Sequence, residues 1–254
     1  MKQVVATVVG NTEVMPGVYL LRLNAPSIAT EAKPGQFIMV RCGEDTVLPR
    51  PFSIHRCNSG DIELLYRVVG KGTDLLSRYE RDNNLEIFGP LGNGFALNPE
   101  SRNVLLVAGG IGIAPLGFLA DKAVEQGYSV RLLLGALTES QLYHRNQLPE
   151  AVECIIATED GTSGIKGMIT DLIQNYVNRA DQVFACGPLQ MYRTMSEISE
   201  LKNKPVQVSL EIMMGCGRGI CYGCTIKTKT GLKKVCKHGP VFDLNDIIWG
   251  ELNL

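Results

Sequence analysis

The spacing of apolar residues changes near residue 98, and this change constrains the fold more than any other feature of the chain. Before it, about every second residue is apolar, which is typical of half-buried β-strands. The strands predicted from this alternation cover residues 4–9, 18–23, 37–41, 52–56, 62–69 and 85–88. Turn residues separate them and a short helix fits only at residues 73–79, so we expect an antiparallel β-barrel.

Beyond residue 98 the pattern indicates alternating strands and helices. Residues 104–108 form a continuous apolar run of the buried parallel type, and a helical stretch follows at 116–126. Further strands are predicted at residues 130–134, 153–157, 182–185 and 206–210, with helices at residues 140–147, 168–178 and 190–201. This order favours a five-stranded, doubly wound parallel sheet.

The length of the chain, 254 residues, allows two compact domains and a small tail. We therefore expect a β + α/β protein, with an antiparallel barrel at residues 1–98, an α/β domain at 99–210 and a C-terminal segment at 211–254. This last segment is too short for a core of its own. We expect a metal centre, and not apolar burial, to hold it.

Charge and hydropathy exclude several classes of protein. Charged residues are 20% of the chain and the formal net charge is -1, which indicates neither disorder nor a strongly basic surface for nucleic acid. The first ten residues lack the apolar stretch of a signal peptide, and no apolar run reaches the roughly 20 residues of a membrane-spanning helix. We therefore expect a cytoplasmic protein that binds neither nucleic acid nor membranes.

Four of the eight cysteines crowd into the last fifth of the chain. Their order is C-x4-C-x2-C followed by one more cysteine, at Cys216, Cys221, Cys224 and Cys236. This is the spacing of plant-type ferredoxins, and the glycines between the cysteines allow the sharp bends that such a loop needs. The sequence therefore predicts a [2Fe-2S] cluster. A four-cysteine zinc site is the alternative, but its ligands usually come from two C-x2-C pairs.

A glycine-rich turn follows the first strand of the α/β part. Gly109, Gly110 and Gly112 lie between this strand and a helix that begins near Pro115. The amides of a helix start could receive a pyrophosphate there, although such glycines can also serve packing alone. Cys186 and Gly187 follow a later strand, and parallel strands bring their carboxyl ends to one edge. We expect both turns to face one crevice.

Two segments of the barrel could bind a further phosphate. Arg50 and Pro51 open a predicted strand that continues through Phe52 and Ser53. Thr73 is predicted as the N-cap of a short helix, where backbone amides attract phosphate, and Arg50 could add positive charge opposite it. An edge strand that begins after a proline is the alternative explanation.

The order of these motifs resembles the ferredoxin-NADP reductase superfamily, in which a flavin-binding barrel precedes a pyridine-nucleotide domain. The motifs are RPFS at residues 50–53, LYRVVGKGT at 65–73, GGIGIAP at 109–115 and CGP at 186–188. The tail resembles one branch, the electron-transfer (iron-sulfur flavoprotein) subunit of type B, NAD-dependent dihydroorotate dehydrogenase. His238 stands where that branch often has an acidic residue.

The resemblance implies roles for individual residues. As a hypothesis for the mechanism, we expect the Ser53 hydroxyl or backbone to hydrogen-bond near flavin N5, where hydride arrives, and Cys186 to border the nicotinamide. The implied contacts with FAD come from Arg50, Pro51, Phe52, Ser53, Leu65, Tyr66, Arg67, Gly72 and Thr73. From the two turns described above, we expect contacts with NAD at Gly109, Gly110, Gly112, Pro115, Cys186 and Gly187. The implied cluster ligands are Cys216, Cys221, Cys224 and Cys236.

The resemblance also implies a reaction and a partner. In this family an FMN on a separate catalytic subunit oxidises dihydroorotate, and electrons pass through the cluster and FAD to NAD+ in pyrimidine (UMP) biosynthesis. We therefore expect an NAD-dependent oxidoreductase subunit that forms a heterotetramer with an FMN-containing dihydroorotate dehydrogenase subunit. Glu139 could favour NAD over NADP, or it could simply be an exposed glutamate at a helix start.

Two other functions remain open from the residues alone. The same module could serve an NAD(P)-linked ferredoxin reductase, a sulfide dehydrogenase or a hydrogenase. A protein of another class, a non-catalytic nucleotide-binding module with a tail stapled by zinc, would contain neither iron nor acid-labile sulfide.

Overall fold

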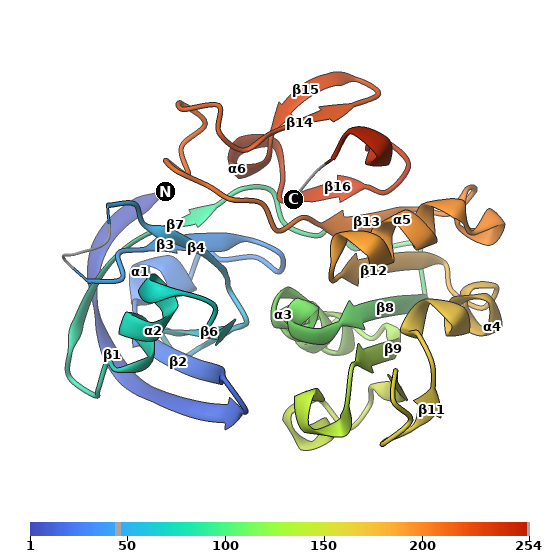
Figure 1. Ribbon diagram of the computed structural model, residues 1–254, viewed down its shortest axis with the longest axis horizontal. Helices are drawn as coiled ribbons and strands as arrows, with labels where there is room; N and C mark the ends of the chain where they lie inside the picture. Colours follow the sequence, from blue (N-terminus) through green and yellow to red (C-terminus); the bar gives the residue numbers. More distant parts are fainter. Residues whose placement is uncertain (44–46, 253–254) are drawn as a thin grey trace.

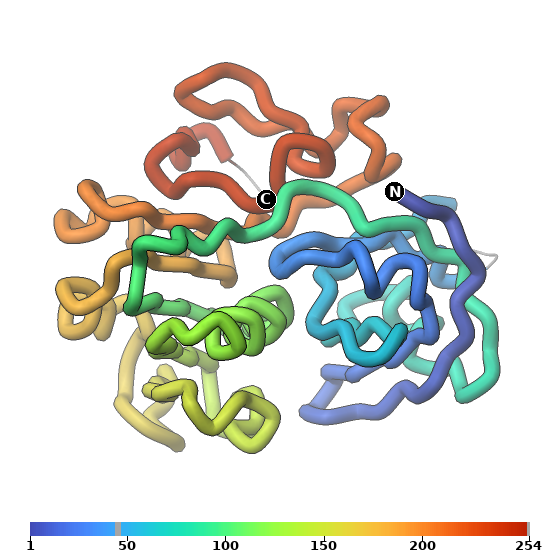
Figure 2. Tube along the Cα trace, turned by 180° about the vertical axis from the view of Figure 1, so that it is seen from behind, coloured from blue at the N-terminus to red at the C-terminus, as the bar shows by residue number. Residues whose placement is uncertain are grey.

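The computed structural model describes residues 1–43 and 47–252. Within these residues the chain forms two seven-stranded sheets that lie side by side, and the C-terminal part lies across both (Figure 1). The extended segment that follows the first sheet crosses to the second beneath this C-terminal part (Figure 2). The predicted β + α/β class is confirmed, with the barrel present as an antiparallel half-barrel.

The first sheet has the strand order β4-β3-β7-β1-β2-β6-β5, and its neighbouring strands are antiparallel. Its strands are β1 (Lys2–Met15), β2 (Val18–Asn24), β3 (Phe37–Val40), β4 (Arg50–Ser53), β5 (Arg56–Asn58), β6 (Asp61–Arg67) and β7 (Asn84–Leu91). Two short helices, α1 (Pro26–Ala29) and α2 (Lys71–Ser77), lie between strands. The sequence indicated α2 but not α1, because four residues are too few to show a helical period.

The single strand predicted at residues 52–56 is wrong, because the chain changes partners in the middle of it. β4 pairs with β3, whereas β5 pairs with β6. At the change, the Ile54 amide donates to the Gln36 carbonyl at 3.0 Å, and the His55 amide donates to the Glu63 carbonyl at 2.7 Å. The sheet turns a corner here, and alternation of side chains cannot reveal a change of partner.

The second sheet has the order β11-β10-β9-β8-β12-β13-β16. Its strands are β8 (Asn103–Gly109), β9 (Ser129–Ala136), β10 (Glu153–Thr158), β11 (Ile165–Lys166), β12 (Gln182–Cys186), β13 (Val206–Ser209) and β16 (Val241–Asp243). All pairs are parallel except β13 with β16. The five predicted strands are present, and β11 and β16 extend the sheet at its two edges. Helix α3 (Ile113–Glu125) follows β8, as predicted.

The helix predicted at residues 140–147 is wrong. The structure has two short 3-10 helices instead, η2 (Glu139–Gln141) and η3 (Arg145–Gln147). The Arg145 guanidinium donates to four backbone carbonyls between residues 148 and 152, and these bonds hold an irregular turn. The other two predicted helices are each divided: η4 (Ile169–Leu172) precedes α4 (Ile173–Val177), and α5 (Leu189–Glu197) precedes η5 (Ser199–Leu201).

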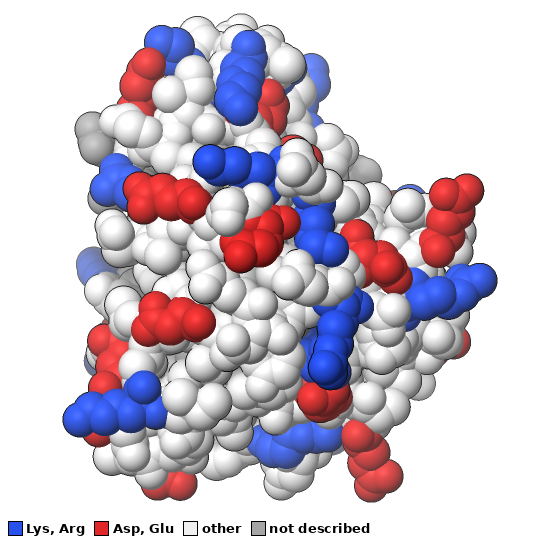
Figure 3. All heavy atoms as spheres, turned by 90° about the vertical axis from the view of Figure 1, so that its right-hand side faces the viewer, with Lys and Arg blue, Asp and Glu red and all other residues white. Residues whose placement is uncertain are grey.

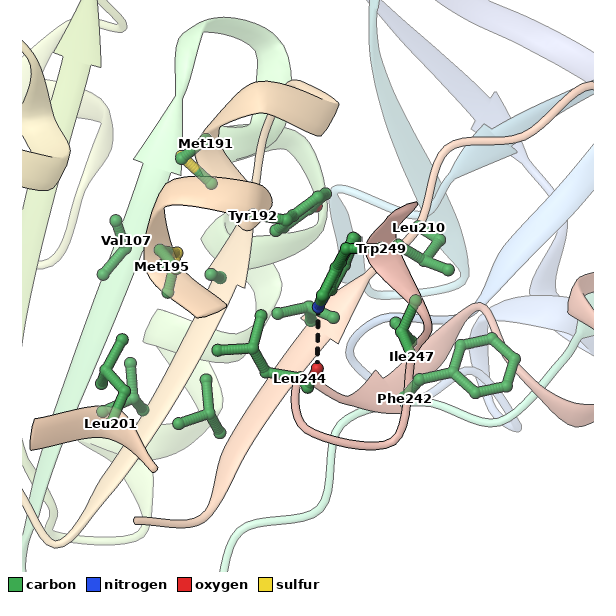
Figure 4. Close-up of a cluster of buried hydrophobic side chains, with 14 of the residues drawn as sticks. Val107, Met191, Tyr192, Met195, Leu201, Leu210, Phe242, Leu244, Ile247 and Trp249 are labelled. Atoms are coloured by element: carbon green, nitrogen blue, oxygen red, sulfur yellow. Dashed lines mark hydrogen bonds between the residues drawn. The ribbon is translucent and has the colours of Figure 1, made fainter. Parts of the chain in front are cut away.

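The C-terminal part packs onto the second sheet. It contains the predicted hairpin, β14 (Thr225–Thr228) with β15 (Gly231–Lys234), then α6 (Val235–His238), β16 and η6 (Trp249–Glu251). The Trp249 ring stacks on Tyr192 of α5 with centroids 5.4 Å apart, and its Nε1 donates to the Leu244 carbonyl at 3.0 Å (Figure 4). Apolar burial therefore does hold this part, because α5 and β13 supply the core that its own sequence lacks.

On the side of the molecule that Figure 3 shows, which is the right-hand side of Figure 1, acidic and basic side chains are intermingled. Among the described residues, none of the helices combines the length and the apolar character needed to cross a membrane.

Candidate functional site

The clustered cysteines lie where the chain leaves the second sheet and passes over the first. Three of them come from the loop between β13 and β14, and the fourth comes from α6, which the β14–β15 hairpin brings back beside that loop. Within the loop Gly217 and Gly219 have φ angles of 63° and 73°, which favour glycine. The predicted sharp bends are therefore present.

Backbone amides point at the cysteine sulfurs. Cys216 Sγ accepts hydrogen bonds from the amides of residues 218, 220 and 221 at 3.4, 3.4 and 3.5 Å. The Gly219 amide donates to Cys236 Sγ at 3.1 Å, and the Cys236 amide donates to Cys224 Sγ at 3.4 Å. Burial raises the pKa of the Cys216 thiol, but these amides outweigh it and lower the pKa to about 6. The loop thus favours the thiolate form of Cys216.

The four sulfurs fall into two pairs. Cys216 interacts with Cys221, and Cys224 interacts with Cys236. Burial and the neighbouring Cys224 raise the pKa of Cys236 to about 12. In the described part of the chain, no three Cys, His, Asp or Glu side chains are grouped so as to hold a single metal ion. A two-iron cluster takes two ligands on each iron, so two thiol pairs with amide donors suit that group.

The proposed flavin segments come together although four strands separate β4 from β6 in the sheet order. The curl of the half-barrel places the Phe52 ring edge-on to Tyr66, with centroids 5.6 Å apart. The first turn of α2 lies beside Arg50, since a Cβ on Gly72 would be 3.3 Å from Arg50 Nε. Pro51, Ser53 and Arg67 are half-buried on the same strands, and Leu65 is buried. The structure therefore assembles both segments in one region.

The placement of Thr73 as an N-cap is wrong. Gly70 precedes α2, and Thr73 is the third residue of the helix. Its hydroxyl oxygen accepts hydrogen bonds from the Val69 amide at 2.9 Å and the Gly70 amide at 3.2 Å. The helix begins earlier than predicted because Thr73 satisfies these two amides from inside the first turn.

The two predicted nucleotide turns lie side by side. β8 ends at Gly109, η1 (Gly110–Gly112) follows, and Pro115 is the third residue of α3. Figure 1 shows β8 beside β12, whose end carries Cys186 and Gly187. At Gly109, Gly112 and Gly187 the packing between the turns leaves no room for a Cβ, which supports the packing explanation for these three glycines.

The Cys186 side chain is fully buried. Its Sγ lies 3.6 Å from the Ser209 carbonyl oxygen, and burial together with Glu211 raises the pKa of the thiol well above its usual range. Its predicted place beside the nicotinamide stays a prediction.

Comparison with known proteins identifies the family. Residues 211–248 match the model described as the iron-sulfur cluster binding domain of dihydroorotate dehydrogenase B. The dihydroorotate dehydrogenase B (NAD(+)) electron transfer subunit of Desulforamulus reducens is 38% identical, over 93% of this chain and 94% of that protein. The chain belongs to this family. The subunit of the same name from Clostridium acetobutylicum is also 38% identical, over 98% of this chain and 99% of that protein. The predicted family and oxidoreductase class of this electron transfer subunit are confirmed.

Solved structures confirm the fold of the electron transfer subunit. An NADH-dependent reduced ferredoxin-NADP oxidoreductase superimposes with a TM-score of 0.88 at 30% identity, covering 97% of this chain and 91% of that one. A ferredoxin NADP+ reductase from Neisseria gonorrhoeae, with bound FAD and NADP, gives a TM-score of 0.65 at 16% identity, over 76% of this chain and 89% of that one. The family match supports iron and sulfide over zinc in the cysteine loop.

Sequence reasoning missed Glu211 of the electron transfer subunit. This residue follows the end of β13, and its Oε1 lies 4.0 Å from Cys186 Sγ. Glu211 is exposed at its surface, but protein atoms surround its carboxyl closely. The resulting desolvation raises the pKa of the carboxyl, and the positive charge of Arg67 partly opposes this rise. A carboxylate directly after a strand of the parallel sheet was the signal available in the sequence.

Proposed function

We propose that this chain carries electrons from an FMN on a catalytic dihydroorotate dehydrogenase subunit, through a [2Fe-2S] cluster and FAD, to NAD+ in pyrimidine biosynthesis. The observation that carries the proposal is the pairing of four cysteines, with amides directed at their sulfurs, on a loop that rests on the flavin-type barrel. When bound, a flavin exchanges hydride with nicotinamide and single electrons with a cluster.

The cysteine loop sits directly on the barrel. The Arg218 guanidinium lies 4.7 Å from the centre of the Phe88 ring on β7, and its Nη2 donates to Gln3 Oε1 at 3.3 Å. Gly217 approaches Met39 on β3 closely, because a Cβ there would be 2.7 Å from the Met39 Cγ. These contacts keep the four ligands, Cys216, Cys221, Cys224 and Cys236, at a fixed place above the barrel.

The barrel residues would bind FAD. Arg50 and the first turn of α2 would hold the phosphates, while Phe52, Tyr66 and their neighbours would form the wall against the ring system. The Ser53 hydroxyl would donate a hydrogen bond near N5, which helps to orient the ring for hydride exchange with the nicotinamide.

The paired turns of the second sheet would bind NAD. Gly110, Gly112 and the start of α3 offer a helix N-terminus to the pyrophosphate, and Gly187 lets the chain pass close to it. Cys186 and Glu211 would flank the nicotinamide. The exposed Glu139 follows β9, where a carboxylate would accept a ribose hydroxyl and repel a 2′-phosphate, so NAD is favoured over NADP.

The catalytic subunit would dock over the cysteine loop, in a heterotetramer of two copies of each subunit. Large apolar side chains are exposed there: Met213 is 91% exposed, Ile220 71% and Tyr222 66%. Leu48 of the barrel adjoins the loop beside Gly215 and is also exposed. Such a patch around a redox centre suits a partner that covers it. A cytoplasmic location is supported by the eight cysteines, none of which forms a disulfide in the part of the chain that the structure describes.

The experiment uses the purified chain alone and then with its catalytic subunit. The chain should contain FAD, with iron and acid-labile sulfide in equal amounts, and NADH should bleach the flavin bands. With the catalytic subunit added, dihydroorotate should reduce NAD+. A colourless protein, or one that contains zinc without sulfide, would contradict the proposal.

A second function has support from one observation. The oxidoreductase that superimposes with a TM-score of 0.88 is 30% identical, which makes an NAD(P)-linked ferredoxin reductase subunit the next candidate. Reduced ferredoxin and dihydroorotate with its catalytic subunit should be compared as electron donors. If reduced ferredoxin reduces the bound flavin and dihydroorotate with its catalytic subunit does not, this second function is favoured.

A further inference from the structure

A buried polar network joins the barrel to the second sheet. His55, at the corner between β4 and β5, is fully buried. Its Nδ1 lies 2.8 Å from the Ala114 carbonyl oxygen, and its Nε2 lies 2.9 Å from the Tyr143 hydroxyl. Ala114 belongs to the first turn of α3, and Tyr143 lies in the irregular segment between η2 and η3. One imidazole thus spans two parts of the fold.

The direction of each hydrogen bond follows from the chemistry of the groups. The Ala114 carbonyl can only accept, so His55 Nδ1 carries a proton and donates it. Burial lowers the pKa of His55 to about 4, so the ring is neutral and Nε2 accepts from the Tyr143 hydroxyl. The Tyr143 oxygen in turn accepts from Arg56 Nη1 at 3.2 Å. The chain of donors therefore runs from Arg56 through Tyr143 and His55 to Ala114.

An ion pair fixes the far end of this network. Arg56 Nε lies 2.6 Å from Asp121 Oδ2 on α3, and the two side chains are only 13% and 24% exposed. Arg56 also donates to the Gln147 carbonyl. A charged hydrogen bond with this degree of burial holds its geometry better than an exposed pair. α3 is therefore tied to the barrel at Ala114 and again at Asp121.

The helix is shaped to receive the imidazole. A Cβ on Gly117 would lie 2.6 Å from His55 Cε1. Glycine inside a helix costs about 1 kcal/mol relative to alanine, so a glycine there needs a compensating contact. The packing of the His55 ring against the bare backbone of α3 supplies it.

The network connects the two places where hydride donor and acceptor would be held. On the flavin side, Ser53 lies two residues before His55. On the nucleotide side, Ala114 lies two residues after Gly112, the last residue of the glycine-rich turn. We propose that His55, Tyr143 and Arg56 are positioning residues that set the nucleotide turn relative to the flavin strand. This rests on the proposed function. Hydride transfer needs reacting atoms about 3 to 3.5 Å apart, and a shift of about 1 Å can slow a reaction about 100-fold.

Tyr143→Phe tests the proposal because it removes one hydroxyl and leaves the ring. At saturating NADH the rate of flavin reduction should fall about tenfold, while FAD content and the half-saturating NADH concentration stay within about twofold, since alignment and not binding is lost. Without nucleotide, amides at the start of α3 should exchange hydrogen for deuterium faster. Tyr128→Phe is the matched control, because that hydroxyl donates to the Asn98 carbonyl away from the network.

The proposal is overturned if Tyr143→Phe matches the wild type in both rate and exchange, or if Tyr128→Phe changes both equally. If Tyr143→Phe does not fold, Asp121→Asn carries the same expectation. If NADH cannot reduce the FAD bound to the wild-type protein, the proposed function is refuted instead. The hydrogen-exchange measurement would still test the network.

Discussion

Gly112 lies so close to Cys186 that a Cβ on the glycine would be 2.0 Å from the Cys186 carbonyl oxygen. The turn after β8 and the end of β12 are therefore packed backbone against backbone. We expect Gly112→Ala to displace the turn and to slow the reduction of bound FAD by NADH at least tenfold, with FAD and iron contents unchanged. This is an order-of-magnitude expectation for a misplaced ligand.

Stopped-flow absorbance would measure this rate, and Gly10→Ala serves as the control because nothing lies within 4 Å of a Cβ there. A Gly112→Ala protein that reacts as fast as the wild type would remove the turn from the nucleotide site.

Ser53→Ala should slow flavin reduction by NADH and leave FAD bound. The hydroxyl would orient the flavin for hydride without holding the cofactor, so the expected loss is roughly tenfold in rate. Ser129→Ala, at the exposed start of β9, should behave as the wild type. An unchanged rate in Ser53→Ala would exclude the hydroxyl from the mechanism.

Cys224→Ser should lose most of the bound iron and acid-labile sulfide. Its sulfur is buried beside Cys236, and serine is a poor ligand for this kind of cluster. Cys154→Ser, on β10, should keep both at the wild-type level. Chemical analysis of the anaerobically purified proteins measures the difference, and equal iron in the two variants would contradict the ligand assignment.

Trp249→Ala should lower the free energy of unfolding by about 3 kcal/mol, the usual range for removing a large buried side chain. The ring stacks on Tyr192 and closes the core between α5 and the C-terminal part (Figure 4). Ile220→Ala should change it by less than about 0.5 kcal/mol, because Ile220 is 71% exposed. Urea denaturation followed by circular dichroism would distinguish the two, and a small effect at Trp249 would refute its structural role.

His55 should make the protein less stable in acid. In the unfolded chain its pKa is near 6.5, whereas burial and Arg56 lower it to about 4 in the folded chain. Between pH 6.5 and 4, His55 binds a proton in the unfolded state but not in the folded state. Stability from this residue is complete above that pH and falls by about 1.4 kcal/mol per unit down to pH 4, about 3 kcal/mol in all.

The His55→Gln protein should therefore show a weaker dependence of stability on pH between 6.5 and 4. His144→Gln, at an exposed position, should retain the wild-type slope. Arg56 is the charged group that acts directly on His55, whereas Glu63 and Asp121 act on its partner Tyr143, and neither variant changes any of these three charged residues. An identical slope in His55→Gln would show that the imidazole is not buried in its neutral form.

Local patterns predicted those elements whose residues carry their own signal. Alternation revealed the antiparallel strands, and continuous apolar runs revealed the five central strands of the second sheet. Residues 140–147 misled, because the Arg145 side chain binds the backbone carbonyls of residues that follow it and so holds an irregular turn, which the apolar pattern does not reveal. Likewise, the strand at residues 52–56 gave no sign that Ile54 and His55 bond to different neighbours.

The sequence by itself determined the two kinds of sheet, the order of the motifs and the four cysteines of the loop, because period, spacing and residue type are local properties of a chain. Only the tertiary structure decided that Phe52 meets Tyr66, that Glu211 reaches Cys186, and that His55 binds Ala114. These pairs lie far apart in the chain or on strands that are not neighbours. They meet because the first sheet curls and the second packs against it, and burial of apolar surface from both fixes that arrangement.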